Sequence, residues 1–228
     1  IPGLATQPGK KPVVALVTDP TSQSKEHEFN QAAIQKMVFR GVRATTGEKT
    51  DAAAWKKLFK PSDVVGLKVN CLFGMGASTH PEVVYAIIEG LKLAGVKPEN
   101  MIIWDRNDGE LMRGGYEINR DGPGVKCYGT NGDYEERVTE KGSFKGRITK
   151  ILTERCTALV NVPILKDHGI AGVTISFKNH LGTCDNPGAQ HGNHCHPFLS
   201  DLNASPAIKD KTRLIVVDAI RPLANGGP

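Results

Sequence analysis

The sequence predicts an α/β fold, with a mostly parallel sheet flanked by helices and a loop-rich excursion that contains cysteine and histidine. Short apolar runs alternate along the chain with longer segments of helical periodicity. Strands and helices in this alternating order favour a parallel sheet with right-handed crossovers. In addition, four of the seven histidines lie between His180 and His196, in a segment rich in turn residues.

Five apolar runs predict the strands. Each contains several valine, isoleucine or leucine residues and is bounded by proline, glycine or polar residues, as is typical of buried parallel strands. In chain order the runs are residues 13–18, 64–70, 101–105, 157–163 and 213–218. A shorter strand is expected around residues 125–127, inside a glycine- and charge-rich surface excursion from Gly109 to Gly146.

Four segments with helical signals separate these strands. The clearest begins at Thr79, where a hydroxyl residue precedes Pro81 and Glu82, a pattern typical of a helix N-terminus. Its apolar face ends near Gly95. The predicted helices cover residues 26–42, 51–59, 79–93 and 172–181.

Length and composition indicate one globular domain. The 228 residues include 39% hydrophobic and 23% charged residues, which is ordinary for a folded domain. Residues 1–12 are interpreted as a flexible leader and residues 13–228 as a single α/β domain. No apolar run approaches the ~18 residues of a membrane helix. The net charge of +5 is spread along the chain, so we expect neither a membrane span nor a nucleic-acid partner.

The segment from His180 to His196 supplies donors for a metal. Thiolate and imidazole are the usual protein ligands of zinc, copper and iron, so we expect either a transition metal ion or an iron–sulfur cluster. An iron–sulfur cluster normally needs four thiolates, and the chain contains no Cys-x-x-Cys pair. The alternative is a polar loop whose histidines contact solvent or substrate. The expected ligands are Cys71, Cys184, His191, His194, Cys195 and His196.

A second group of residues suits acid–base chemistry. Lys166 and His168 follow a predicted strand and are expected to transfer protons on a bound acid. Lys178 and Asn179 lie near the end of the next predicted helix and are expected to contact the substrate. The alternative for Lys178 is a favourable interaction with the helix C-terminus.

The helix start at Thr79 and His80 suits a small anion such as a carboxylate. The positive end of a helix attracts anions. Lys68 and Asn70, at the end of the preceding strand, are expected to share this site. The alternative for His80 is a capping residue that binds no ligand.

Several segments together resemble the domain of unknown function 362 family, and they follow the expected order along the chain: residues 65–70, 78–84, 161–168, 172–179, 217–220 and 225–228. This family is similar in arrangement to the lactate racemase superfamily. Some members are joined to ferredoxin-type modules, and some carry twin-arginine export signals. The resemblance implies one cleft formed by Lys68, Asn70, Thr79, His80, Lys166, His168, Lys178 and Asn179.

The sequence departs from the family pattern in three respects. The usual Lys-Thr-His is here Lys166-Asp167-His168, and the Cys/His segment is denser than expected. The chain also stops where the family usually continues, so we expect the domain to lack its C-terminal part.

Three functional hypotheses follow. The leading one is an exported protein, periplasmic or extracellular, that binds a metal or an iron–sulfur cluster and exchanges electrons with a redox partner protein. Five cysteines, an odd number, exclude a complete set of internal disulfides. The second is an enzyme that acts on a small carboxylate through lysine and histidine. The third is a homo-oligomeric structural protein with metal at its interface. Whether the protein is an enzyme stays open at this point.

Overall fold

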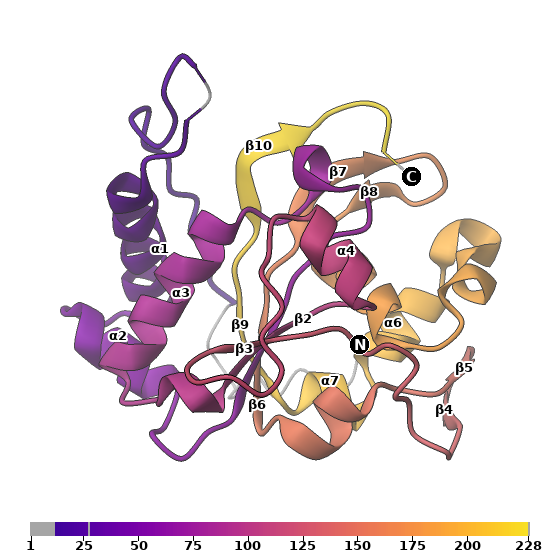
Figure 1. The fold of residues 1–228 in the computed structure, drawn as a ribbon. Coiled ribbons are helices and arrows are strands. Elements are labelled where there is room, and N and C mark those ends of the chain that lie inside the picture. The colour runs from indigo at the N-terminus through magenta and orange to yellow at the C-terminus, as the bar shows by residue number, and fades with distance from the viewer. Residues whose placement is uncertain (1–11, 27, 228) are drawn as a thin grey trace.

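The computed structural model describes residues 12–26 and 28–227 (Figure 1). Apart from Pro12, the leader expected at residues 1–12 lies outside the described residues. Within these ranges, five parallel strands form the central sheet in the order β3-β2-β1-β6-β9. Their bounds are β1 (Val65–Lys68), β2 (Met101–Trp104), β3 (Lys126–Cys127), β6 (Ala158–Asn161) and β9 (Thr212–Ile215). The α/β fold with a mostly parallel sheet is therefore confirmed.

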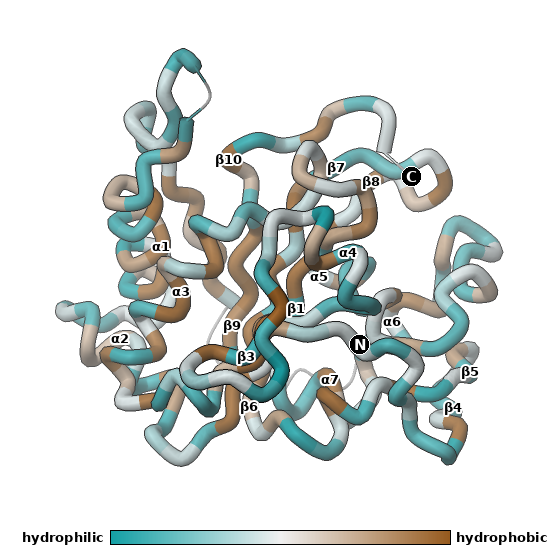
Figure 2. Tube along the Cα trace, viewed as in Figure 1, coloured by the Kyte–Doolittle hydropathy of each residue, from teal (hydrophilic) through white to brown (hydrophobic). Residues whose placement is uncertain are grey.

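Side chains of the central sheet alternate between two apolar cores. Val65 and Leu67 of β1 belong to the core under α1 (Gln31–Thr46), α2 (Asp51–Leu58) and α3 (Pro81–Leu93). Neighbouring positions such as Ile102 and Trp104 of β2 belong to the core on the opposite face. In Figure 2 the strands of this sheet carry much of the brown, hydrophobic colour between the two layers.

The opposite face is covered by short elements. They are α6 (Phe198–Asn203), α7 (Pro206–Lys209), a π-helix (Ile151–Arg155) and the hairpin of β4 (Thr139–Lys141) and β5 (Phe144–Gly146). Figure 1 shows α6, α7 and this hairpin on the side of the sheet away from α1, α2 and α3. The two layers therefore differ, with long helices on one face and short helices and loops on the other.

A second, smaller sheet adjoins the carboxyl edge of the central one. Its order is β10-β7-β8, with bounds β7 (Ile164–His168), β8 (Gly172–Thr174) and β10 (Asp218–Leu223). β7 follows β6 after only two residues, runs parallel to β10 and pairs antiparallel with β8. This sheet stands above the ends of β1, β2 and β6 (Figure 1).

The remaining helices are short and lie near the loops. They are α4 (Asp108–Arg113), α5 (Ser176–Asn179) and the 3-10 helices Met75–Ala77, Pro98–Asn100, His180–Thr183 and Pro187–Cys195. Among residues 12–26 and 28–227, no helix combines the length and the apolar character needed to cross a membrane.

The strand predicted at residues 13–18 was wrong. This segment has no strand partner among the described residues, and Val14 and Leu16 are 93% and 88% exposed. An apolar run forms a buried strand only if a neighbouring strand supplies hydrogen bonds.

Two helix predictions also need correction. The helix expected at residues 26–42 is α1, which begins after Asn30 because the Asn30 side chain accepts a hydrogen bond from the Ala33 amide. It continues to Thr46 and ends there because the next residue, Gly47, adopts a left-handed conformation. The helix expected at residues 172–181 is instead β8 followed by α5, because residues 172–174 pair with β7.

The last predicted strand and the surface excursion are partly right. Residues 213–218 divide into β9 and the start of β10, which belong to different sheets. The excursion from Gly109 to Gly146 contains the expected strand at residues 126–127, but most of α4 lies within it, and Leu111 of that helix is fully buried. The helices at residues 51–58 and 81–93 agree with prediction.

Candidate functional site

Polar side chains gather where β1, β2 and β6 end. Lys68 is the last residue of β1 and lies opposite Trp104 of β2 and Asn161 of β6. Asp105 follows β2 directly. Ligands of open parallel sheets bind at this carboxyl edge, so the ends of these strands mark a candidate site.

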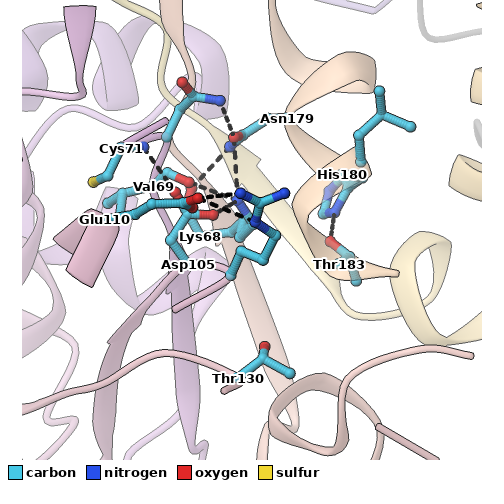
Figure 3. Close-up of polar contacts among 12 residues, drawn as sticks. Lys68, Val69, Cys71, Asp105, Glu110, Thr130, Asn179, His180 and Thr183 are labelled. Carbon is cyan, nitrogen blue, oxygen red and sulfur yellow. Dashed lines mark hydrogen bonds and ion pairs between the residues drawn. The ribbon is translucent and has the colours of Figure 1, made fainter. Parts of the chain in front are cut away.

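Lys68 and Asp105 form a buried ion pair at the base of the site (Figure 3). The Nζ atom of Lys68 donates to Oδ1 of Asp105 at 2.7 Å and to the carbonyl oxygen of Val69 at 2.6 Å. The other carboxylate oxygen of Asp105 accepts the amide proton of Cys71 at 2.7 Å. Both charges are therefore compensated inside the protein.

Asn179 connects this ion pair to the neighbouring strands. Its side-chain amide donates to the carbonyl oxygen of Lys68 at 3.0 Å and to Oδ1 of Asn161 at 2.7 Å. Its Oδ1 accepts from Lys68 and from Asn70, each at 3.3 Å. Gly182 packs against the ion pair so closely that an added Cβ atom would lie 2.9 Å from Oδ1 of Asp105. The base of the site is therefore tightly packed.

The small sheet supplies a wall of the site. Lys166 and His168 lie two residues apart on β7, so both side chains project from one face. Thr174 of β8 is the cross-strand partner of Lys166 and projects from that face as well. All three residues are buried.

Lys166 is held by neutral groups alone. Its Nζ atom donates to Oδ1 of Asn70 at 2.8 Å and to the carbonyl oxygen of Ala77 at 3.2 Å, and it lies over the ring of Phe73. Burial, reinforced by the nearby charge of Lys178, lowers the pKa of Lys166 to about 8. Lys166 therefore forms a neutral amine closer to physiological pH than an ordinary lysine does.

His168 is held in a neutral form. Its Nδ1 atom accepts the backbone amide protons of Ile170 at 3.1 Å and Ala171 at 3.0 Å. Burial, together with the charge of Lys178, lowers the pKa of His168 to about 4. With Nδ1 acting as an acceptor, the ring proton lies on Nε2, and His168 can donate from that atom.

Lys178 contacts His191 at the far side of the site. The Nζ atom of Lys178 lies 3.2 Å from Nε2 of His191, whose Nδ1 lies 2.9 Å from the carbonyl oxygen of Pro187. His191 also stacks on His168, with ring centroids 5.5 Å apart. Burial lowers the pKa of Lys178. One contact uses one of its three N–H donors and leaves the others for a ligand.

These residues line a pocket of about 420 Å³. Its wall contains four cationic side chains but only two carboxylates, those of Asp105 and Glu110. Asp105 pairs with Lys68, and Glu110 pairs with Arg106. In the described part of the chain, no carboxylate lies within ion-pair distance of Lys166 or Lys178, so the pocket carries an excess of positive charge.

The pocket contains six of the eight residues expected around one cleft: Lys68, Asn70, Lys166, His168, Lys178 and Asn179. Thr79 and His80 do not line it. The Thr79 hydroxyl donates to the carbonyl oxygen of Val162 at 2.7 Å and accepts the amide proton of Asn70 at 3.0 Å. The Thr79 hydroxyl therefore joins the segments that follow β1 and β6.

The anion expected at the start of α3 is a carboxylate of the protein itself. Oδ2 of Asp218 accepts the backbone amide proton of His80 at 2.8 Å and lies 2.7 Å from its Nδ1. His80 is the N-cap residue of α3, and its ring packs against Phe29. The expected anion site at this helix start is therefore filled.

The expected metal ligands lie apart. Cys71 belongs to the core under α3, whereas Cys184 belongs to the core on the opposite face of the sheet. His194 and His196 are exposed, and Nδ1 of His194 lies 2.9 Å from the carbonyl oxygen of Ile170. Across the described residues, no group of three or more histidine, cysteine or acidic side chains could hold a metal ion.

Burial also disfavours the thiolate form of two of the expected ligands, Cys71 and Cys184. All five are buried and free of disulfides. Burial raises the pKa of Cys71, and it raises the pKa of Cys156 to about 12 and that of Cys184 to about 11. Metals bind the thiolate, which burial disfavours. As placed here, the residues do not fit a shared metal or iron–sulfur centre.

Several residues of the pocket were not predicted. Asp105 has a recognisable signal, because it is an acidic residue at the end of an apolar strand. Arg106 lies just before the glycine-rich excursion and Glu110 at its start, and neither has a comparable signal. Thr174 reaches the pocket only because β8 pairs with β7.

A comparison with protein families identifies the family of the chain. A family model described as a domain of unknown function (DUF362) matches residues 65–228. The chain belongs to this family. The DUF362 match begins at β1 and includes every residue that lines the pocket. None of the curated proteins matches the chain. Because the DUF362 description assigns no activity, function has to be argued from the site.

Proposed function

We propose that the protein is an enzyme that binds a small carboxylate in this pocket and transfers a proton on it. One observation carries the proposal: Lys166 and Lys178 line the pocket without a carboxylate partner among the described residues. Burying a positive charge without a counter-ion is costly, and a bound anion removes that cost.

The two lysines suit different tasks. Lys178 has N–H donors to spare and suits the carboxylate of the ligand. Lys166 already donates to two protein oxygens, and its pKa of about 8 places it close to neutral pH. A group with such a pKa exchanges protons readily at physiological pH, so Lys166 is assigned as the acid–base group.

The proton transfer balances without a redox step. The neutral amine of Lys166 takes a proton from the carbon next to the carboxyl group, and the electron pair of that C–H bond moves onto the carboxylate. Lys178 and the Nε2–H group of His168 stabilise the charge that develops there. Return of the proton from the Lys166 ammonium restores the amine.

Calorimetric titration with butanoate tests the binding step. Lys178→Met is expected to weaken binding about tenfold or more, because a charge-assisted hydrogen bond is lost. Lys97→Met, which changes an exposed lysine that precedes β2 and does not line the pocket, is the matched control and is expected to bind as the wild type does. Equal affinity of the wild type and Lys178→Met would contradict the assignment of Lys178.

Deuterium exchange tests the chemical step. Small carboxylates are incubated with the protein in deuterated water, and NMR measures deuterium at the carbon next to the carboxyl group. Lys166→Met is expected to abolish incorporation, since it removes the base, and His168→Leu is expected to reduce it, since it removes a hydrogen-bond donor. Undiminished incorporation by Lys166→Met would rule out this base.

The metal-centred redox function stays a prediction. Elemental analysis and visible absorption of natively purified protein address it directly. Stoichiometric iron, zinc or copper in the wild type would favour that function over the acid–base proposal.

A further inference from the structure

Thr174 differs from the other polar residues of the pocket. It is 3% exposed, lines the pocket and has a hydroxyl oxygen without a hydrogen-bond partner in the described part of the chain. The amide of Asn179 and the ammonium of Lys166, by contrast, are both hydrogen-bonded to protein atoms. Buried hydroxyl groups nearly always have a partner, so this exception calls for an explanation.

The position of Thr174 indicates where a partner would come from. Thr174 pairs with Lys166 across β7 and β8, so the two side chains lie about 5 Å apart at their Cβ atoms on one face of the small sheet. His168 projects from the same face, two residues along β7. The space next to these three side chains is the pocket itself. A ligand bound there would supply a hydrogen-bond partner for the hydroxyl.

We infer that Thr174 determines specificity by hydrogen bonding to a second polar group of the bound carboxylate. The inference rests on the proposed function and narrows its substrate to acids that carry a hydroxyl, oxo or amino substituent close to the carboxyl group. A plain alkyl acid leaves the Thr174 hydroxyl unpaired. Because Thr174 lies next to Lys166, this substituent lies close to the carbon whose proton is transferred.

The first test measures the ligand-free protein. Thr174→Val replaces the hydroxyl by a methyl group of similar shape, and Thr174→Ser keeps the hydroxyl. Thr174→Val is expected to raise the midpoint of thermal unfolding, because it removes an unpaired buried hydroxyl. A lower midpoint for Thr174→Val than for the wild type would show that the hydroxyl has a partner in the protein, and it would overturn the inference.

The second test measures ligand preference by calorimetry. The ligands are butanoate and its 2-hydroxy, 2-oxo and 2-amino derivatives, which separate the three possible substituents. The wild type and Thr174→Ser are expected to bind at least one derivative about tenfold more tightly than butanoate. In Thr174→Val this preference is expected to disappear.

Different results would overturn the inference about Thr174 and the proposed function. If the wild type binds all four acids equally, or if Thr174→Val keeps the preference, the inference about Thr174 is wrong and the proposed function stands. If the wild type binds none of the four acids, the proposed function fails and this inference fails with it.

Discussion

The Nζ atom of Lys68 lies 2.7 Å from Oδ1 of Asp105, and both side chains are buried. Asp105→Asn is expected to lower the free energy of unfolding by about 3–5 kcal/mol, because it leaves the charge of Lys68 buried and unpaired. Urea denaturation measures this loss. Glu89→Gln breaks the exposed Lys92–Glu89 pair and serves as control, with an unfolding midpoint close to that of the wild type.

Lys166 makes stability depend on pH in the alkaline range. Its pKa falls from 10.5 to about 8 on folding, so the unfolded chain binds its proton more tightly. Below pH 8 the lowered pKa of Lys166 reduces the free energy of unfolding. This reduction disappears as the pH rises from about 8 to 10.5. The unfolding free energy of the wild type, measured relative to Lys166→Met, is therefore expected to rise across this window. A flat difference would show that Lys166 has an ordinary pKa.

His168 makes stability depend on pH in the acid range. Its pKa falls from 6.5 to about 4 on folding, because burial and the charge of Lys178 disfavour the protonated ring. Between these values the unfolded chain binds the proton and the folded protein does not, so stability falls as the pH drops from 6.5 to 4. His168→Gln is expected to reduce this fall in chemical denaturation series. His194→Gln changes an exposed histidine and is the control.

Gly90 allows α3 to approach α2 closely. A Cβ atom at this position would lie 2.0 Å from Cε2 of Trp55, which is fully buried. Gly90→Ala is expected to destabilise the protein by about 1–3 kcal/mol, because the core has no room to adjust without strain. Gly169→Ala is the control, since an added Cβ there meets no atom within 4 Å. Similar thermal midpoints for both variants would contradict the close packing seen here.

The sequence predicted the fold where local signals and tertiary packing agree. The runs that became β1, β2 and β6 are apolar on both faces, and both faces are covered by helices or loops. The helix from Pro81 begins with proline and an acid and also packs against the sheet. In such cases a single-sequence pattern and the final structure have the same physical cause.

The failures arise where long-range pairing decides the structure. Residues 13–18 have the composition of a strand, but no neighbouring strand in the described part of the chain pairs with them. Residues 172–174 look helical in isolation, yet they pair with β7. No local pattern contains this information, because it depends on residues far along the chain or in an adjacent hairpin.

The candidate site was predicted in part for the same reason. The family resemblance implied one cleft around Lys68, Lys166 and Lys178, and all three line the pocket. The metal-ligand hypothesis relied on residue type alone, and type does not say on which face of the sheet a side chain lies. Cys71 and Cys184 are an example, since they lie in different cores.

The pairing of β10 with β7 also has a consequence for synthesis. Lys166 and His168 leave the ribosome well before Asp218, which opens the strand that flanks them. Until β10 has been synthesised and has paired with β7, one edge of β7 has unpaired amide and carbonyl groups. A nascent chain is then open to pairing with a foreign strand, which makes this interval a point of aggregation risk.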